Sequence, residues 1–290
     1  MKLGARSRSA GSAAERAALA LALGDPLLEL IPLKNLADQV PHLPAGARVS
    51  VTASPAKGLE ATLDWSAMLA ADGFRVTPHL SARMVRDRAH LAALLDQARA
   101  AGLDHAFVVG GDAEEPGDYP DGLSLLRAMA ELGHPFTTLG CPAYPEGHPV
   151  IPDDALLRAM GDKAPYVAHV TTQLSFNTAA IARWVGDRRA AGFTTPVVLG
   201  VPGVSDPQRL LSIAARVGVK DARRFVTRNL GFVTGLARSG GFYRPTGFVN
   251  GVAPLLADPA AGVTGFHLYT FNAVEATERW RRETQEQLAG

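Results

Sequence analysis

With 290 residues, the chain is long enough for two average domains or for one large α/β barrel. Its 47% hydrophobic residues, 20% charged residues and formal net charge of +1 are typical of an ordinary globular protein, and they give no indication of a nucleic-acid or membrane-surface partner. The single cysteine, Cys141, excludes an intrachain disulfide and a cysteine-based zinc site. We expect a buried, inert thiol in a protein of the reducing cytoplasm.

The N-terminal region carries basic residues followed by an alanine- and leucine-rich run, an order that superficially matches a secretory signal peptide. Glu15 and Arg16 interrupt this pattern and the apolar run is short. We therefore predict a disordered tail over residues 1–12 and an amphipathic helix over residues 13–23. No stretch of the chain reaches the ~20 apolar residues that a membrane span requires.

Further along the chain, short apolar runs alternate with longer amphipathic segments. The apolar runs predict strands over residues 27–32, 48–53, 74–80, 105–110, 136–141, 166–174, 196–201 and 264–271. The amphipathic segments predict helices over residues 59–72, 87–101, 122–132, 153–163, 178–191 and 206–217, and a last helix that begins at Asn272. Expected N-cap residues are Asp87, Asp121, Asp153, Asn177 and Asp206, and Asn272 with Glu275 matches a capping box.

Eight strands with helices between them favour a (β/α)₈ TIM barrel over an open doubly wound sheet. We expect one domain over residues 13–290, with an extra N-terminal helix and an insertion before strand eight. Residues 220–263, which are rich in arginine, glycine and aromatic residues, break the alternation and predict that insertion.

The first strand contains a carboxylate between aliphatic side chains, at Glu29. Burying a lone charge costs free energy, so such a residue usually has a partner or a chemical role. An apolar environment lets a carboxyl group keep a proton near neutral pH, as a general acid must. A solvent-facing Glu29 on an edge strand, or one in a salt bridge, is the structural alternative.

In a TIM barrel the reactive groups gather where the strands end. The polar residues at those ends are Glu29, Thr52, His79, Asp112, Tyr144, His148, Gln173 and Tyr269. Each also has a structural explanation. Asp112 follows two glycines and could serve a turn or a helix cap, the two histidines adjoin prolines, and Gln173 could bond only to backbone. The shared position of the set favours a common site.

Several familiar motifs are absent from the sequence. It has no phosphate-binding loop and no Gly-x-Gly-x-x-Gly after a strand, which argues against a separate dinucleotide domain. No paired-histidine spacing suggests a metal, and no serine lies in a nucleophile elbow. We therefore expect no metal site.

Taken in order, these segments resemble the methylenetetrahydrofolate reductase family. The most specific matches are Tyr144-Pro145-Glu146-Gly147-His148-Pro149 and Phe266-His267-Leu268-Tyr269-Thr270-Phe271-Asn272. Shorter matches are Leu28-Glu29-Leu30-Ile31-Pro32, Ser50-Val51-Thr52, Pro78-His79-Leu80-Ser81, Gly111-Asp112 and Thr172-Gln173. They run in family order from about residue 27 to residue 285.

The resemblance implies reduction of 5,10-methylenetetrahydrofolate to 5-methyltetrahydrofolate by a hydride from NADH or NADPH. By the same resemblance Glu29 is the general acid, and Asp112 is the carboxylate that favours a cationic intermediate. Gln173 hydrogen-bonds the pterin, and Tyr269 contributes to the substrate site. The remaining matches imply cofactor contacts at Thr52, His79, Gly111, Tyr144 and His148.

Two positions depart from the family's flavin-site pattern. Gly110 stands where relatives carry an arginine, and the family's lysine aligns near Asp162, with Lys163 one residue away. Losing cations weakens pyrophosphate binding, although Arg83 or residues 220–244 could compensate. Two routes stay open: a bound FAD that passes on the hydride, or direct hydride transfer from NAD(P)H to the folate.

Two other classes of function remain as alternatives. A barrel lyase or aldolase could use Glu29 as a base, but the core strands contain no lysine for a Schiff base. A non-catalytic folate-binding homologue would not need to retain Glu29, Asp112 and Gln173 together. The choice between NADH and NADPH, the oligomeric state, the polyglutamate-binding surface and the physiological direction stay open.

Overall fold

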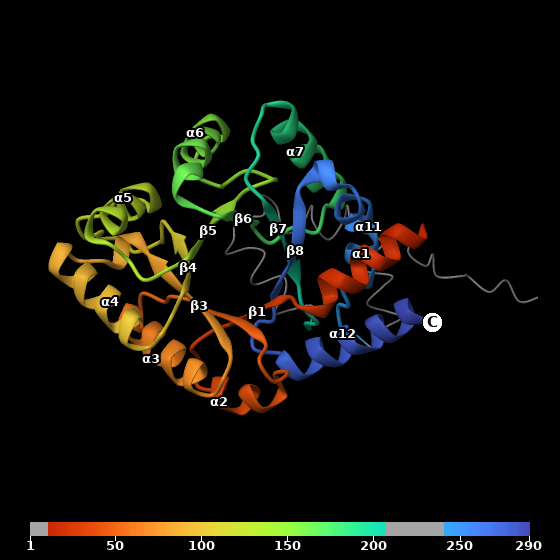
Figure 1. Ribbon diagram of the computed structural model, residues 1–290, viewed down its shortest axis with the longest axis horizontal. Coiled ribbons are helices and arrows are strands. Elements are labelled where there is room, and N and C mark those ends of the chain that lie inside the picture. Colours follow the sequence, from red (N-terminus) through yellow and green to blue (C-terminus); the bar gives the residue numbers. More distant parts are fainter. Residues whose placement is uncertain (1–10, 207–240) are drawn as a thin grey trace, which may run out of the picture.

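The computed structural model describes residues 11–206 and 241–290, in which eight parallel strands close into a barrel in chain order (Figure 1). The strands are β1 (Leu27–Leu30), β2 (Arg48–Val51), β3 (Arg75–Ser81), β4 (His105–Val109), β5 (Thr138–Ala143), β6 (His169–Thr172), β7 (Val197–Pro202) and β8 (Val263–Tyr269). β1 pairs with both β2 and β8, so the sheet has no free edge. The predicted TIM barrel is confirmed.

Helices surround the barrel. They are α1 (Ala13–Gly24), α2 (Leu36–Gln39), α3 (Gly58–Ala71), α4 (Arg88–Ala100), α5 (Gly122–Leu132), α6 (Asp153–Lys163), α7 (Thr178–Ala190), α11 (Thr246–Ala257) and α12 (Val274–Ala289). Short 3₁₀ turns cover Val40–His42, Ala82–Met84, Ala164–Tyr166 and Pro259–Ala261. None of the helices in the described ranges combines the length and the apolar character needed to cross a lipid bilayer.

Part of the predicted layout lies outside the described residues. The described residues do not include the helix expected over residues 206–217, except for Asp206. They also do not include most of the expected tail over residues 1–12, or residues 220–240 of the insertion. The remainder of the insertion contains α11 and the 3₁₀ turn that leads into β8.

Three of the predicted helix caps are confirmed. The side chains of Asp87, Asp121 and Asn177 accept hydrogen bonds from backbone N–H groups in the first turns of α4, α5 and α7. The prediction for Asp153 was wrong, because Pro152 occupies the N-cap position and Asp153 is the first helical residue.

The predicted capping box at Asn272 was also wrong, because α12 begins two residues later and Ala273 is its N-cap residue. The Asn272 side chain instead bonds to the end of the neighbouring strand, β1. Its Oδ1 accepts a hydrogen bond from the Ile31 N–H at 2.9 Å, and its Nδ2 donates to the Ile31 carbonyl at 2.8 Å. Asn272 therefore holds the end of β8 against the end of β1, in a left-handed conformation (φ 57°) that asparagine tolerates.

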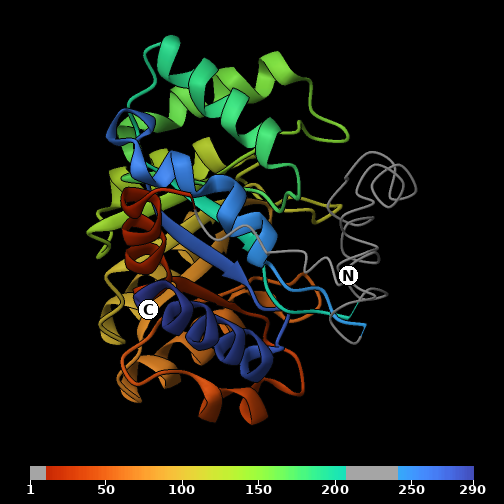
Figure 2. The same cartoon turned by 90° about the vertical axis from the view of Figure 1, so that its right-hand side faces the viewer.

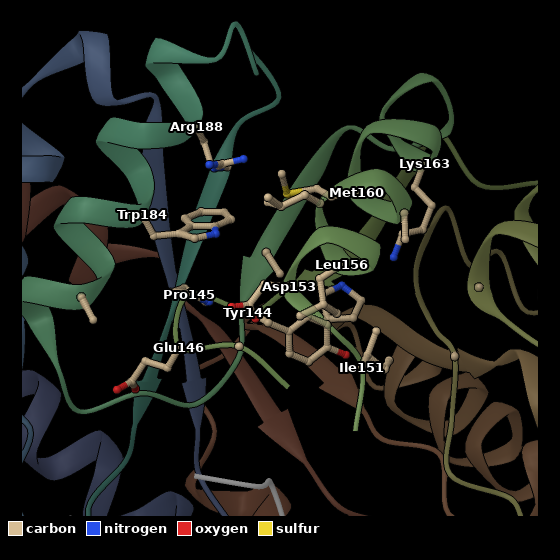
Figure 3. Close-up of a pocket in the computed structure, with 18 of the residues that line it drawn as sticks. Tyr144, Pro145, Glu146, Ile151, Asp153, Leu156, Met160, Lys163, Trp184 and Arg188 are labelled. Carbon is tan, nitrogen blue, oxygen red and sulfur yellow. The ribbon is translucent and has the colours of Figure 1, made fainter. Parts of the chain in front are cut away.

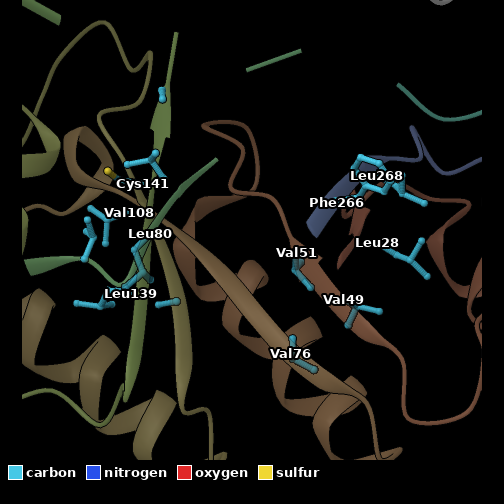
Figure 4. Close-up of a cluster of buried hydrophobic side chains, with 14 of the residues drawn as sticks. Leu28, Val49, Val51, Val76, Leu80, Val108, Leu139, Cys141, Phe266 and Leu268 are labelled. Carbon is cyan, nitrogen blue, oxygen red and sulfur yellow. The ribbon is translucent and has the colours of Figure 1, made fainter. Parts of the chain in front are cut away.

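The largest hydrophobic cluster lies between the strands and the helices. Side chains alternate along a strand, so Leu28 and Leu30 stand on the opposite face of β1 from Glu29. Figure 4 shows aliphatic side chains of this layer, among them Leu28, Leu268 and Val49, on neighbouring strands. The aliphatic residues beside Glu29 thus fill the layer under the helices, while Glu29 points into the barrel.

The expected extra helix, α1, packs against α11, α12 and β8, and Figure 2 shows it beside α12. A buried ion pair supports this contact. The Arg281 guanidinium lies 2.8 Å from the Glu278 carboxylate within α12 and donates a 2.8 Å hydrogen bond to the Leu23 carbonyl at the end of α1. Satisfied in this way, a buried charge can hold two helices together.

Candidate functional site

A cavity of about 860 Å³ opens where the barrel strands end. It brings together eight of the nine predicted site residues from six different strands or the loops that follow them. These residues are Glu29, His79, Gly111, Asp112, Tyr144, His148, Gln173 and Tyr269. The grouping expected from the strand ends is therefore present in three dimensions.

Thr52 is the exception among the predicted residues, because it does not line this cavity. It follows β2, where its N–H donates to the Leu30 carbonyl and its own carbonyl accepts from the Thr62 hydroxyl at 3.2 Å. Thr52 therefore links β2 to β1 and α3, and its backbone is already occupied by structural bonds.

The centre of the cavity floor is a pair formed by Glu29 on β1 and His267 on β8. Glu29 Oε2 lies 3.1 Å from His267 Nε2, and the two residues are 8% and 1% exposed. Glu29 pairs with Tyr269 across the sheet, so His267, two residues earlier on β8, projects to the same inner side. The buried carboxyl group that stood out in the sequence has a hydrogen-bond partner and still reaches the cavity.

His79 stands beside this pair on β3 and is 7% exposed. Burial lowers the pKa of its imidazole to about 4, although the Glu29 carboxylate acts in the opposite direction. His79 is therefore neutral at neutral pH. Its Nε2 has no hydrogen-bond partner among the described residues, and the same holds for His267 Nδ1. Such buried polar atoms can bind a polar ligand.

Glu29, His79 and His267 also have the composition of a metal site, since each offers one ligand atom and these atoms lie within 4.8 Å of one another. No spacing in the sequence indicates this set, because the residues come from three separate strands. Two members of the set, Glu29 and His267, already form a hydrogen bond with each other.

Aromatic side chains form two walls of the cavity. Tyr269 packs against His267 with ring centroids 4.8 Å apart, and its hydroxyl donates to the Thr172 carbonyl at 3.0 Å. Burial raises the pKa of Tyr269 well above its ordinary value, so its hydroxyl keeps its proton. On the other side, Tyr144 meets His148 edge to face at 5.2 Å. These rings suit a flat, largely apolar ligand.

Asp112 and Gln173 are at the rim of the same cavity. Asp112 is exposed and caps no helix in the described ranges, so the helix-capping explanation does not apply. Gln173 does bond to backbone, because its Oε1 accepts from the Leu174 N–H at 2.8 Å. Its amide nitrogen has no hydrogen-bond partner among the described residues and can donate to a ligand.

Gly111 lies between these groups with φ of 88°, a conformation that favours glycine. A Cβ atom here would meet Ser81 Oγ at 2.0 Å, so a larger residue would collide with β3. Beside it, Arg83 donates to the carbonyls of Ala113 and Glu114 at 2.7 and 3.0 Å. Arg83 therefore holds the loop after β4 in place, and its charge is partly used there.

Among the lining residues that were not site candidates in the sequence, His267 and Phe107 contact predicted ones, Glu29 and His79. His267 belongs to one of the most specific motif segments, yet nothing local shows that its ring meets Glu29. Phe107, inside β4, looks like an ordinary core residue, but its ring packs 4.9 Å from that of His79. Alternation along β8 with Tyr269 is the signal that could have identified His267.

A family model described as methylenetetrahydrofolate reductase matches residues 31–282 of this chain. The match begins two residues after Glu29. A relative from Caenorhabditis elegans, named probable methylenetetrahydrofolate reductase (NADPH), is 30% identical over 129 residues. That alignment covers 41% of this chain and 19% of the relative, so the chain matches a minor part of the relative's length.

Solved structures show the same architecture at low sequence identity. A mutant class V chitinase from Cycas revoluta, in complex with (GlcNAc)3, superimposes with a TM-score of 0.51 at 9% identity, covering 91% of this chain and 99% of the chitinase. The GH18 chitinase from the same plant gives 0.50 at 10% identity, with the same coverage. At these identities the likeness shows the barrel fold alone.

Proposed function

Because this chain belongs to the methylenetetrahydrofolate reductase family, we propose that it reduces 5,10-methylenetetrahydrofolate to 5-methyltetrahydrofolate with a hydride from a reduced nicotinamide nucleotide. The observation that carries the proposal is the buried Glu29–His267 pair on the floor of an aromatic-walled cavity. A folate is a flat ring system that needs a proton donor within reach, and this cavity provides both.

The chemistry assigns a task to each group. A proton from the Glu29 carboxyl group goes to a nitrogen of the substrate's five-membered ring, a C–N bond breaks, and a cationic iminium forms. The hydride then adds to the one-carbon unit and makes the methyl group, while the nicotinamide is oxidised. His267 positions Glu29 through the 3.1 Å hydrogen bond. Asp112 at the rim favours the positive charge of the iminium.

Two further groups are suited to hold the substrate. The Gln173 amide nitrogen is available to bond the edge of the pterin ring. The neutral imidazole of His79 adds no positive charge beside the iminium, since burial lowers its pKa to about 4. A protonated histidine at this position would repel that cation.

The same cavity fits part of a flavin dinucleotide. A flavin, when bound, would relay the hydride between nicotinamide and folate. The aromatic walls at Tyr144 and His148 fit its ring system, and Gly111 permits close approach to the backbone. The diphosphate fits less well, because Arg83 is the one lysine or arginine among the described lining residues and it bonds to loop carbonyls. Direct transfer from the nicotinamide and transfer through a flavin therefore both remain within the proposal.

The alternative function, that of a barrel lyase or aldolase, has little support in the residues of this site. A Schiff-base aldolase needs a lysine at the reacting carbon, and no lysine is among the described residues that line the cavity.

The proposal is tested by mixing the purified, flavin-stripped protein anaerobically with methylenetetrahydrofolate and NADH, and then with NADPH. We expect loss of the reduced-nicotinamide absorbance together with formation of methyltetrahydrofolate. If neither donor is consumed, with or without added FAD, the reductase proposal fails and a folate-binding role takes its place.

Glu29→Gln tests the assigned acid. The amide keeps the size of the side chain but cannot deliver the proton, so we expect turnover to fall about 100-fold or more while folate binding is largely kept. The matched control is Glu131→Gln on the surface of α5, which should leave turnover unchanged. A Glu29→Gln variant with the full rate would contradict the role of Glu29.

A further inference from the structure

The floor of the first cavity carries three buried side chains that can act together as metal ligands, Glu29 on β1, His79 on β3 and His267 on β8. Each offers one carboxylate oxygen or imidazole nitrogen, and these three atoms lie within 4.8 Å of one another. In a tetrahedral zinc site, ligand atoms at about 2.1 Å from the metal are about 3.4 Å apart. No pair therefore has to close by more than about 1.5 Å to hold one ion.

The hydrogen bond between Glu29 and His267 already has a suitable length. Glu29 Oε2 and His267 Nε2 are 3.1 Å apart, which is close to the separation of two ligands of one zinc ion. A metal ion can thus take the place of the proton in this hydrogen bond with little movement of either side chain.

His79 is the member of the set whose burial no hydrogen bond explains. Its Nε2 atom is buried and has no hydrogen-bond partner among the described residues. Its ring packs against that of Phe107 with centroids 4.9 Å apart, and this contact keeps the imidazole at the cavity floor. A buried imidazole nitrogen without a partner calls for a ligand, and imidazole nitrogen is a common ligand of zinc.

The charges around the cavity favour a cation. Besides Glu29, the described lining residues include Asp112, Glu114 and Asp121, whereas Arg83 is the one lysine or arginine among them. The guanidinium of Arg83 also bonds to loop carbonyls. A cavity with an excess of negative charge raises the local concentration of cations.

A second cavity, of about 600 Å³ between α6 and α7, differs in this respect. Three cationic side chains line it, Lys163, Arg183 and Arg188. Figure 3 shows Arg188 on α7 and Lys163 on α6, on either side of this cavity. Their charges oppose the entry of a metal cation, so of these two cavities the first is the one in which both the ligand atoms and the charge suit a metal.

We propose that Glu29, His79 and His267 form a binding site for Zn²⁺ or a similar divalent transition-metal cation. One carboxylate oxygen and two imidazole nitrogens are a ligand set that suits zinc. Because all three residues line the cavity, the fourth coordination position opens into it. The bound cation occupies the carboxylate that would otherwise carry a proton, so zinc inhibits the reduction reversibly. The inhibition rests on the proposed reductase function, whereas binding of the metal does not.

The direct test is calorimetric titration of the intact protein, prepared without a histidine tag, with zinc chloride. We expect saturable binding of a single zinc ion per chain. His79→Gln removes an imidazole ligand and should weaken this binding about tenfold or more. The matched control is His42→Gln, at an exposed position, which should bind zinc like the unmodified protein. Glu29→Gln repeats the test if His79→Gln fails to fold.

Two further measurements identify the site and its effect. Co²⁺ replaces zinc and absorbs visible light more strongly in a four-coordinate site than in water, so we expect this absorption in the unmodified protein and its loss in His79→Gln. In the folate assay, zinc should inhibit the unmodified protein and His42→Gln alike, and a chelator should restore turnover.

Three results would overturn the proposal: no saturable zinc binding, unchanged zinc affinity in both His79→Gln and Glu29→Gln, or loss of binding in His42→Gln, which would show an adventitious surface ion only. A protein that binds zinc through His79 but never reduces the folate would refute the reductase function and leave the metal site standing. An active reductase that binds no zinc would refute the metal site alone.

Discussion

Glu29 is recognisable in the sequence as an unusual residue, but its partner is not. His267 lies 238 residues further along the chain, and the parallel pairing of β1 with β8 brings the two together. The hydrogen bond fixes which way the carboxyl group points inside the barrel. A general acid must be held close to the atom it protonates, so in the proposed reaction the task of His267 is to position Glu29.

Replacing His267 should therefore impair turnover more than substrate binding. We expect His267→Leu to lower kcat about tenfold or more, because Glu29 loses the hydrogen bond that orients it, while KM for the folate changes little. His267→Gln, which keeps a polar atom near Nε2, should recover part of the rate. Steady-state kinetics checks both variants, with His169→Gln as a control for a barrel histidine outside the site. Equal rates in the Leu and Gln variants would point to a purely structural His267.

At the scale of elements, most strands lie within two or three residues of their sequence-based positions. Strand β5, for example, covers residues 138–143 where residues 136–141 were expected. Caps such as Asp87 were correct because the cap and the backbone N–H group that donates to it lie within one helical turn. Asn272 was misassigned because the partners of its side chain, the backbone groups of Ile31, lie 241 residues away in the sequence, at the end of the neighbouring strand β1.

The glycine of β7 shows how one strand shapes the site on another. Gly200 lies beneath the Tyr269 ring, and a Cβ there would approach Tyr269 Cε2 at 2.6 Å and the Thr172 carbonyl at 2.2 Å. The absence of a side chain leaves room for Tyr269 to cross β7 and donate to Thr172.

We expect Gly200→Ala to displace Tyr269 and to weaken folate binding, with some loss of stability from the contact with backbone. Equilibrium folate binding and thermal unfolding measure the two effects. Gly265→Ala on β8 is the matched control, because nothing lies within 4 Å of its added Cβ. If the two alanine variants bind folate equally well, Gly200 does not position Tyr269.

For the whole molecule, closure of the barrel removes titratable groups from water. Burial lowers the pKa values of His79 and His169 to about 4. In the unfolded chain each would have a pKa of about 6.5. Below that value the unfolded state takes up protons that the folded state does not, so stability is complete above about pH 6.5 and decreases as the pH falls toward 4.

We therefore expect the free energy of unfolding to fall by about 1.4 kcal/mol per pH unit for each histidine between roughly pH 6 and pH 4.5. His169→Gln should reduce this slope, whereas His42→Gln, at an exposed position, should not. Urea unfolding at a series of pH values measures the slope. An unchanged slope in His169→Gln would show that His169 titrates alike in the folded and unfolded states.

Local patterns in the sequence predict the alternation of strands and helices, the barrel class, the family resemblance and eight of the residues that line the cavity. These follow from periodicity, capping and position at strand ends, which depend on neighbours a few residues apart. The folded chain alone shows that His267 bonds to Glu29, that Thr52 lies outside the cavity, and that Arg188 and Lys163 face one cavity from two helices. These outcomes depend on how closure of the barrel staggers its strands and spaces its helices, and no local pattern in the chain encodes that geometry.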